Sequence, residues 1–162
     1  MAGEHGSDTR LIDAWRANSR YRRDWALRLL HARVFAHGPD ATIGLWGLAY
    51  KADTAFMKNS PAVALLEALP GRLIRAYDPA ARLDRSAFPK VEQVADPIDA
   101  CRGADVLLVM TPWAEFRSIP VDRVRAAMRG RQIIDPYGVM DSAGAKASGF
   151  AHYRLGEAWS AN

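Results

Sequence analysis

The chain has 162 residues, of which 49% are apolar and 25% charged, and its formal net charge is +4 at pH 7. These values are ordinary for a globular protein with one substantial core. No apolar run is long enough to span a bilayer, and residues 1–10 lack the apolar stretch of a signal peptide, so the sequence excludes a membrane protein and predicts a cytoplasmic one.

The N-terminal part of the chain is predicted to be a tail followed by a helix. Residues 1–9 are small and polar, and we expect them to be disordered or to derive from cloning. Residues 10–37 are predicted to form one long helix, because apolar residues recur at three- and four-residue steps until Gly38-Pro39 ends the pattern. Its apolar surface exceeds what a small domain can cover, so we expect it to pack on a second copy of the chain or on a missing neighbour. Its arginines are interpreted as solvated or interface residues, and no nucleic acid is expected as a partner.

Residues 40–158 are predicted to form an α/β domain, because apolar runs bounded by turn residues alternate with helical patterns. Strands are predicted at 42–46, 73–77, 91–94, 106–110 and 132–135, with a last one within 150–156. Helices are predicted at 61–69, 97–102 and 121–128. The alternation predicts a Rossmann-like parallel sheet with helices on both faces, preceded by the long N-terminal helix.

The first predicted strand leads into the most informative segment of the chain. Glycines break the apolar run at Gly44-x-x-Gly47, and Lys51 follows at the carboxyl end of the strand, where ligands bind in open α/β sheets. Lys58 lies further along the same turn, and the next helix begins at Ser60-Pro61, a good N-cap and first-turn pair. The segment predicts a phosphate-bearing ligand, although its glycines do not form the G-x-G-x-x-G fingerprint of a dinucleotide site.

Five blocks of the chain resemble, in order and spacing, the C-terminal nucleotide-binding domain of the UDP-glucose/GDP-mannose dehydrogenase family. The blocks are Gly47-Leu48-Ala49-Tyr50-Lys51, Lys58-Asn59-Ser60-Pro61, Ala76-Tyr77-Asp78-Pro79, the stretch from Gly103 to Phe116 with Thr111-Pro112-Trp113-Ala114-Glu115-Phe116, and the stretch from Ile133 to Asp141. The resemblance covers about residues 11 to 156.

The resemblance implies a set of substrate-binding residues. The set is Tyr50, Lys51, Lys58, Ser60, Trp113 and Tyr137. Lys51 would hold a phosphate as a point charge, the alternative being a solvated loop lysine. Tyr50 and Trp113 would flank a base or sugar, and core packing is the alternative for both; capping is the first role expected of Ser60. The chain departs from the family at Asp135-Pro136-Tyr137-Gly138, where the family has a substrate-binding arginine.

The resemblance also implies a reaction that this chain alone does not complete. The family's NAD-dependent oxidation of the sugar C6 alcohol to a carboxylate uses an N-terminal Rossmann domain and a catalytic cysteine loop, neither of which is present in these residues. Cys101 is interpreted as a buried structural thiol, no metal site is expected, and the only catalytic candidate is Asn18, where the family has an active-site asparagine.

Three functions remain open at the level of the sequence. The first is the C-terminal portion of such a dehydrogenase, which binds a UDP-sugar or GDP-sugar and dimerises through the long helix, with NAD bound by the missing Rossmann domain. The second is a stand-alone, non-catalytic nucleotide-sugar-binding module. The third is a dimerisation scaffold with a vestigial pocket.

Overall fold

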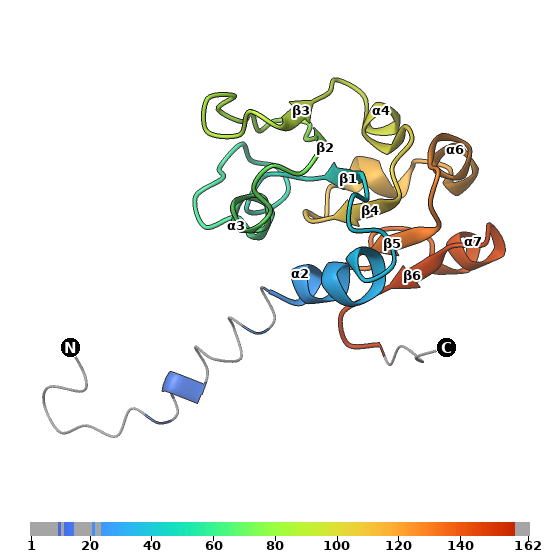
Figure 1. Cartoon of the computed structure of the whole chain (residues 1–162), viewed down its shortest axis with the longest axis horizontal. Coiled ribbons are helices and arrows are strands. Elements are labelled where there is room, and N and C mark those ends of the chain that lie inside the picture. Colours follow the sequence, from blue (N-terminus) through green and yellow to red (C-terminus); the bar gives the residue numbers. More distant parts are fainter. Residues whose placement is uncertain (1–9, 11, 15–20, 22–23, 158–162) are drawn as a thin grey trace, which may run out of the picture.

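The strands form a single parallel sheet. The computed structural model describes residues 10, 12–14, 21 and 24–157, and its six strands lie in the order β3-β2-β1-β4-β5-β6, every neighbouring pair being parallel (Figure 1). The strands are β1 Ile43–Trp46, β2 Ile74–Tyr77, β3 Val91–Gln93, β4 Val106–Val109, β5 Gln132–Ile134 and β6 Ala151–Tyr153. All six predicted strands are confirmed, with ends that differ from the prediction by a residue or so.

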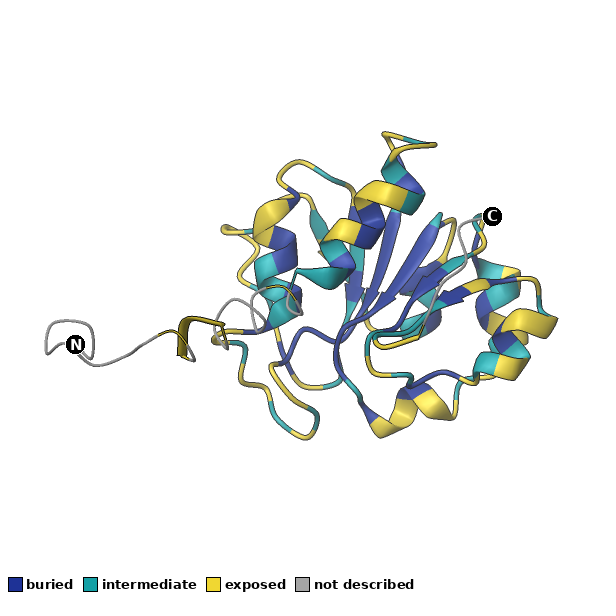
Figure 2. Ribbon diagram, turned by 90° about the horizontal axis from the view of Figure 1, so that it is seen from below, coloured by how far each residue is buried: buried dark blue, intermediate teal, exposed yellow. Residues whose placement is uncertain are grey.

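Short helices connect the strands. They are α3 Pro61–Ala68, α4 Pro97–Cys101, α5 Ala114–Arg117, α6 Val121–Ala127 and α7 Ser142–Ala147. Figure 2 shows helices on both sides of the buried strands, with their exposed residues directed outward. The Rossmann-like class predicted from the sequence is therefore confirmed. Within the described part of the chain, no helix is long and apolar enough to cross a bilayer.

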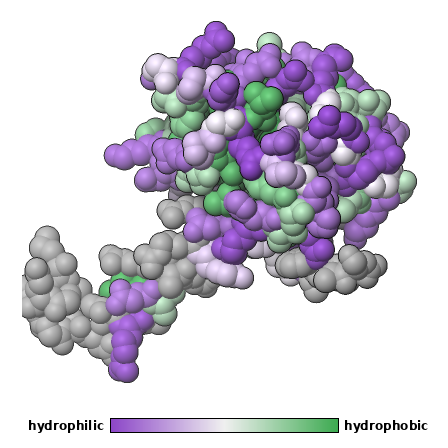
Figure 3. Space-filling view, viewed as in Figure 1, coloured by the Kyte–Doolittle hydropathy of each residue, from purple (hydrophilic) through white to green (hydrophobic). Residues whose placement is uncertain are grey.

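The two central strands explain why the sheet needs cover on both faces. All four residues of β1 and all four of β4 are buried, whereas the edge strands β3 and β6 are only partly so. Gly44 lets a helix approach β1 closely, because a Cβ built there would lie 2.7 Å from the carbonyl oxygen of Ala100 in α4. The resulting core is apolar and continuous, while the surface seen in Figure 3 is mainly hydrophilic.

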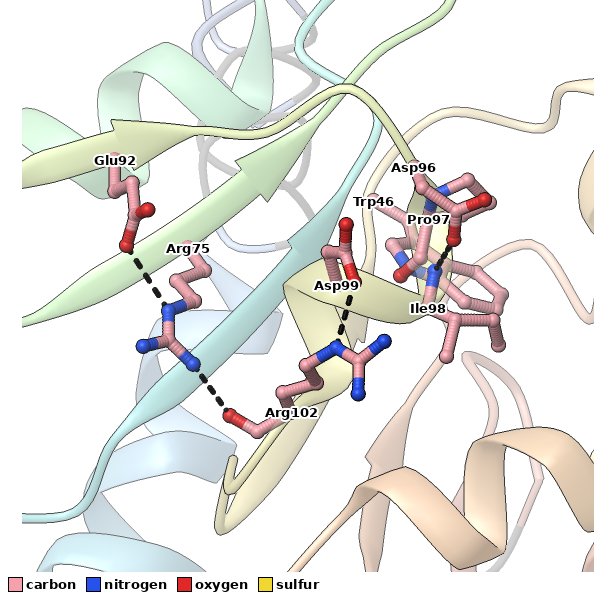
Figure 4. Close-up of polar contacts among 8 residues, drawn as sticks. All are labelled: Trp46, Arg75, Glu92, Asp96, Pro97, Ile98, Asp99 and Arg102. Carbon is pink, nitrogen blue, oxygen red and sulfur yellow. Dashed lines mark hydrogen bonds and ion pairs between the residues drawn. The ribbon is translucent and has the colours of Figure 1, made fainter.

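Polar contacts fasten α4 to the sheet (Figure 4). Asp96 caps the helix by accepting the N–H of Ile98 at 2.7 Å, and the Trp46 indole donates to the carbonyl of Pro97 at 2.7 Å. Arg75 in β2 pairs with Glu92 in β3 at 3.0 Å and donates to the carbonyl of Arg102 at 2.8 Å. These contacts hold α4 against β1 and β2, and they join β2 to β3.

The N-terminal helix is described only in part. Its described portion contains α2, Trp25–Leu30, and the π-helical η2, His31–Phe35, and residues 10, 12–14 and 21 before them are helical too. Ala26, Leu29, Leu30 and Val34 are buried in the domain core. A single long helix over residues 10–37 is not shown, and most of the segment before Asp24, together with residues 1–9, lies outside the described residues.

Candidate functional site

The carboxyl ends of the parallel strands meet at one edge of the sheet. β1 is followed there by Gly47, β2 by Asp78, β4 by Met110-Thr111, β5 by Asp135 and β6 by Arg154. In an open parallel sheet this is the edge at which ligands bind. The residues that follow these strands therefore form the candidate site, which we call the carboxyl edge.

A buried carboxylate organises the centre of the carboxyl edge. Asp78 is 1% exposed, and its Oδ2 accepts the backbone N–H groups of Leu48 at 2.7 Å and Ala49 at 3.0 Å. Its Oδ1 accepts the N–H groups of Ala80 and Ala81 at 2.9 and 2.7 Å. One side chain thus joins the loop after β1 to the loop after β2, and its negative charge is matched by backbone donors.

The loop between β1 and α3, residues 47–60, is pinned at both its start and its middle. Gly47 has a φ of +89°, and a Cβ built on it would lie 2.5 Å from the Cβ of Thr111, so only glycine fits. The Thr111 hydroxyl donates to the carbonyl of Ala49 at 2.7 Å. Further on, the Tyr50 N–H donates to the carbonyl of Phe56 at 2.7 Å. The loop that carries Lys51 is therefore held in a defined position.

The structure brings two of the predicted site residues together. Tyr50 is 52% exposed and Tyr137 is 47% exposed. Partial burial of the ring raises the pKa of Tyr137, and the nearby phenol of Tyr50 raises it further. Phe56 is 57% exposed, so three aromatic rings lie open to solvent in the two loops that follow β1 and β5.

The predicted lysines lie in the same loop. Lys51 and Lys58 are both exposed, and within the described part of the chain neither has an ion-pair partner. Two residues between and beside them, Asp53 and Asn59, adopt positive φ of 61° and 62°. The loop thus presents two unpaired cations at the rim of the sheet.

Ser60 and Trp113 are buried, and both form hydrogen bonds within the protein that hold the loops in place. Ser60 is the N-cap of α3, as predicted, and its hydroxyl accepts the N–H of Ala62 at 3.2 Å. Trp113 is 8% exposed, and its indole N–H donates to Asp78 at 3.2 Å. Asn18, the candidate on the N-terminal helix, lies outside the described residues.

A buried pair holds the loop after β5. Asp135 is fully buried; its Oδ2 accepts the N–H of Met140 at 2.9 Å and lies 3.3 Å from Nε2 of His152 in β6. This pair fixes the turn that contains Tyr137 and Gly138.

The sequence placed Asp135 in a family block but did not identify its contact with His152, or the hydrogen bonds by which Asp78 joins two loops. Asp78 directly follows a predicted strand and Asp135 is the last residue of another, and these positions were the available signal.

Cavities and reactive groups elsewhere do not suggest a competing catalytic centre. A cavity of about 830 Å³ lies at the opposite edge of the sheet, where Asp105 and Arg129 pair with one another beside Arg33 and His37. Burial raises the pKa of the Cys101 thiol to about 12, and the nearby Asp96 charge adds to this, so the thiol is structural as predicted. Among the described residues, no three or more His, Cys, Asp or Glu are grouped to hold a metal ion.

Comparison with known proteins identifies the family. Residues 44–142 match the model of the UDP-glucose/GDP-mannose dehydrogenase family, UDP binding domain. The UDP-glucose 6-dehydrogenase of Pseudomonas aeruginosa is 29% identical over 164 residues, which cover 96% of this chain and 36% of that protein. The corresponding enzyme of Rhizobium meliloti is 27% identical over 158 residues, with the same two coverages.

Solved structures agree on the fold. The UDP-D-ManNAc dehydrogenase of Pyrococcus horikoshii superposes with a TM-score of 0.77 at 24% identity, covering 96% of this chain and 35% of that one. The chain spans about a third of the length of the relatives it matches. The matched residues contain β2 to β5, all of β1 but its first residue, and the whole loop that carries Lys51. The chain belongs to the UDP-glucose/GDP-mannose dehydrogenase family and contains its UDP-binding domain.

Proposed function

We propose that the chain is the nucleotide-sugar-binding portion of an NAD-dependent 6-dehydrogenase of the UDP-glucose/GDP-mannose type, which oxidises the sugar C6 alcohol to a carboxylate. The observation that carries this proposal is the position of Lys51: an unpaired, exposed cation in a pinned loop at the carboxyl edge, next to the exposed ring of Tyr50. A lysine in this place binds phosphate, and an open aromatic ring beside it stacks on a base or sugar.

The arrangement of the rest of the edge supports the same ligand. Tyr137 adds a second ring and a phenol that stays protonated at neutral pH, since its pKa is raised. Lys58 adds a second positive charge in the loop after β1. In this proposal Tyr50, Lys51, Lys58 and Tyr137 contact the nucleotide-sugar, while Ser60 and Trp113 position the loops. The relatives named UDP-glucose 6-dehydrogenase, which align along almost the whole chain, suggest UDP-glucose as the first ligand to test.

The residues of this chain do not fit a nicotinamide dinucleotide. Residues 47–60 separate β1 from the start of α3, so no glycine-rich turn leads directly from the strand into a helix. The space beside Gly47, where a phosphate would approach the backbone, is filled by Thr111. NAD would accept hydride from the sugar in the complete reaction, and we propose that it binds a part of a longer protein outside this chain, which spans about a third of its relatives' length.

Calorimetric titration of the 162-residue chain with UDP, UDP-glucose and GDP-mannose tests the proposal. We expect at least one of them to bind, and Lys51→Ala to weaken that binding about tenfold through loss of a charged contact. Lys90→Ala is the matched control, because Lys90 precedes β3 and lies at the opposite edge of the sheet. A folded wild-type chain that binds none of the three ligands contradicts the proposal, and so does equal weakening by the two substitutions.

We further propose that the N-terminal segment forms a homodimer contact. Two large apolar side chains in its described residues are open to solvent, Ile12 at 43% and Tyr21 at 63%, and a second copy of the same segment would cover them. Sedimentation equilibrium of the chain should give a dimer, and a chain shortened to begin at Asp24 should sediment as a monomer. A monomer at micromolar concentration in the full chain contradicts this contact.

A further inference from the structure

Arg154 is the first residue after β6 and therefore lies at the carboxyl edge. Its guanidinium lies over the loop after β5, because a Cβ built on Gly138 would be 2.6 Å from its Nε and 2.7 Å from its Nη2. Gly138 has a φ of +62° and no side chain, and this leaves room for the guanidinium to lie directly on the backbone. The guanidinium thus lies against the turn that contains Tyr137 and Gly138, at the carboxyl ends of β5 and β6.

The hydrogen-bonding capacity of Arg154 is largely unused. Its Nη1 pairs with Glu157 at 2.8 Å, and the two side chains are 37% and 48% exposed, so this ion pair is screened by solvent. Its Nε is buried and has no hydrogen-bond partner in the described part of the chain. A buried N–H without an acceptor is unfavourable, and an acceptor atom brought by a ligand would satisfy it.

Arg154 and Lys51 belong to one surface. Lys51 follows Tyr50, and Arg154 contacts the residue that follows Tyr137. The Tyr50 phenol is close enough to raise the pKa of Tyr137, and the Arg154 guanidinium lies against Gly138, so the loop that carries Lys51 and the turn that Arg154 contacts are neighbours at the carboxyl edge. One cation comes from the β1 side and the other from the β6 side, with β4 and β5 between them in the sheet.

Two cations of different kinds suit a ligand with two adjacent anionic groups. A lysine neutralises a phosphate as a point charge, whereas the planar guanidinium donates two parallel N–H groups to phosphate oxygens. Glu157 accepts from one of these donors. A diphosphate would replace this screened contact with a charge-assisted one at the same guanidinium.

We propose that Arg154 is a second phosphate-binding residue of this edge, which contacts the diphosphate and makes the chain select nucleoside diphosphates over monophosphates. This inference rests on the nucleotide-sugar-binding function proposed above. Arg154, directly after the last strand, would supply the positive charge that the Tyr137-Gly138 turn lacks.

The test compares the affinities for UDP and UMP, because a purely structural arginine would affect both equally. We expect Arg154→Gln to weaken UDP binding about tenfold and UMP binding little, so that their ratio falls, and Arg154→Lys to retain part of the preference. Arg131→Gln is the matched control: Arg131 also lies against a glycine, Gly149, but it precedes β5 and lies at the opposite edge. Its ratio should equal that of the wild type.

Two outcomes overturn the inference, and they show whether the proposed function fails with it. If the wild type binds UDP and Arg154→Gln leaves the UDP/UMP ratio unchanged, only the role of Arg154 is rejected. If the wild type binds none of UDP, UDP-glucose and GDP-mannose, both proposals are rejected, and if it binds GDP-mannose alone, the same ratio is measured with GDP and GMP. Should Arg154→Gln lose the fold by circular dichroism, Glu157→Gln decides: freeing the guanidinium should raise UDP affinity severalfold at low salt, and an unchanged affinity rejects the role.

Discussion

The indole N–H of Trp113 donates to Oδ2 of Asp78 at 3.2 Å, and this contact joins the end of β4 to the end of β2 above β1, which lies between them. The same oxygen accepts two N–H groups of the loop after β1. A single carboxylate therefore sets the relative positions of three loops at the carboxyl edge, including the loop that carries Lys51.

Asp78→Asn should destabilise the protein by about 3 kcal/mol, because an amide NH₂ in this buried place would face N–H donors instead of accepting from them. Chemical denaturation measures the loss. Asp84→Asn is the control: the exposed Asp84 carboxylate accepts from the N–H and hydroxyl of Ser86, and its loss should cost below about 1 kcal/mol. Equal losses in the two variants would show that the buried hydrogen bonds of Asp78 contribute no more to stability than the exposed ones of Asp84.

Gly47→Ala should destabilise the protein by about 2–4 kcal/mol. The new methyl group must overlap Thr111, and the residue must hold a φ of +89°. Gly71→Ala separates the two causes, because Gly71 has a φ of +78° but no atom within 4 Å of its built Cβ. Gly71→Ala should lower the free energy of unfolding by only the cost of the positive φ, about 1 kcal/mol, in the same denaturation experiment. If Gly71→Ala costs as much, the close contact with Thr111 is not responsible.

Asp105 links stability to acid pH. Its hydrogen bonds to the Arg129 guanidinium lower its pKa, and the N–H of Thr42 contributes further. A carboxyl whose pKa is lower in the folded state stabilises the protein above its unfolded pKa of about 3.9, and this stabilisation is lost as pH falls through the lower folded value. Unfolding free energies measured between about pH 5 and about pH 2 should therefore decline less steeply in Asp105→Asn than in the wild type.

Arg129→Gln provides the companion measurement, because it removes the largest cause of the shift and leaves the Thr42 bond in place. Its decline in unfolding free energy between about pH 5 and about pH 2 should be intermediate between those of the wild type and Asp105→Asn. The guanidinium side chain is 66% exposed, so we expect the loss at neutral pH to stay near about 1 kcal/mol. A pH dependence of stability identical to that of the wild type would show that Arg129 does not lower the pKa of Asp105.

Cys101 should be unreactive in the native protein. Its side chain is fully buried and its pKa is raised to about 12, so at neutral pH its thiolate fraction is about a thousandfold below that of an exposed cysteine. Reaction with a chromogenic disulfide reagent should proceed only as fast as the protein unfolds, and completely in guanidinium chloride. Full labelling of the folded chain within seconds would contradict a structural role.

The sequence by itself determined the sheet and the family. Uninterrupted apolar runs such as Val106–Val109 have few alternatives to a buried parallel strand, because both faces of the strand must be covered. The Ser60-Pro61 helix start is equally local, since the cap and the first turn are neighbours in the chain. The short helices α5 and α7 were not predicted, because they lack the first-turn proline that marks the start of α3 and of the equally short α4.

The tertiary structure decided which of the candidate residues work together. Asp78 binds Leu48 thirty positions away and Trp113 thirty-five positions away, and Arg154 reaches Gly138 from a different strand. No local pattern announces such contacts, because they depend on the strand order, which places β2 beside β1 and β6 beside β5. Tyr50 and Tyr137 meet for the same reason: parallel strands end at one edge, so loops distant in the chain share one surface.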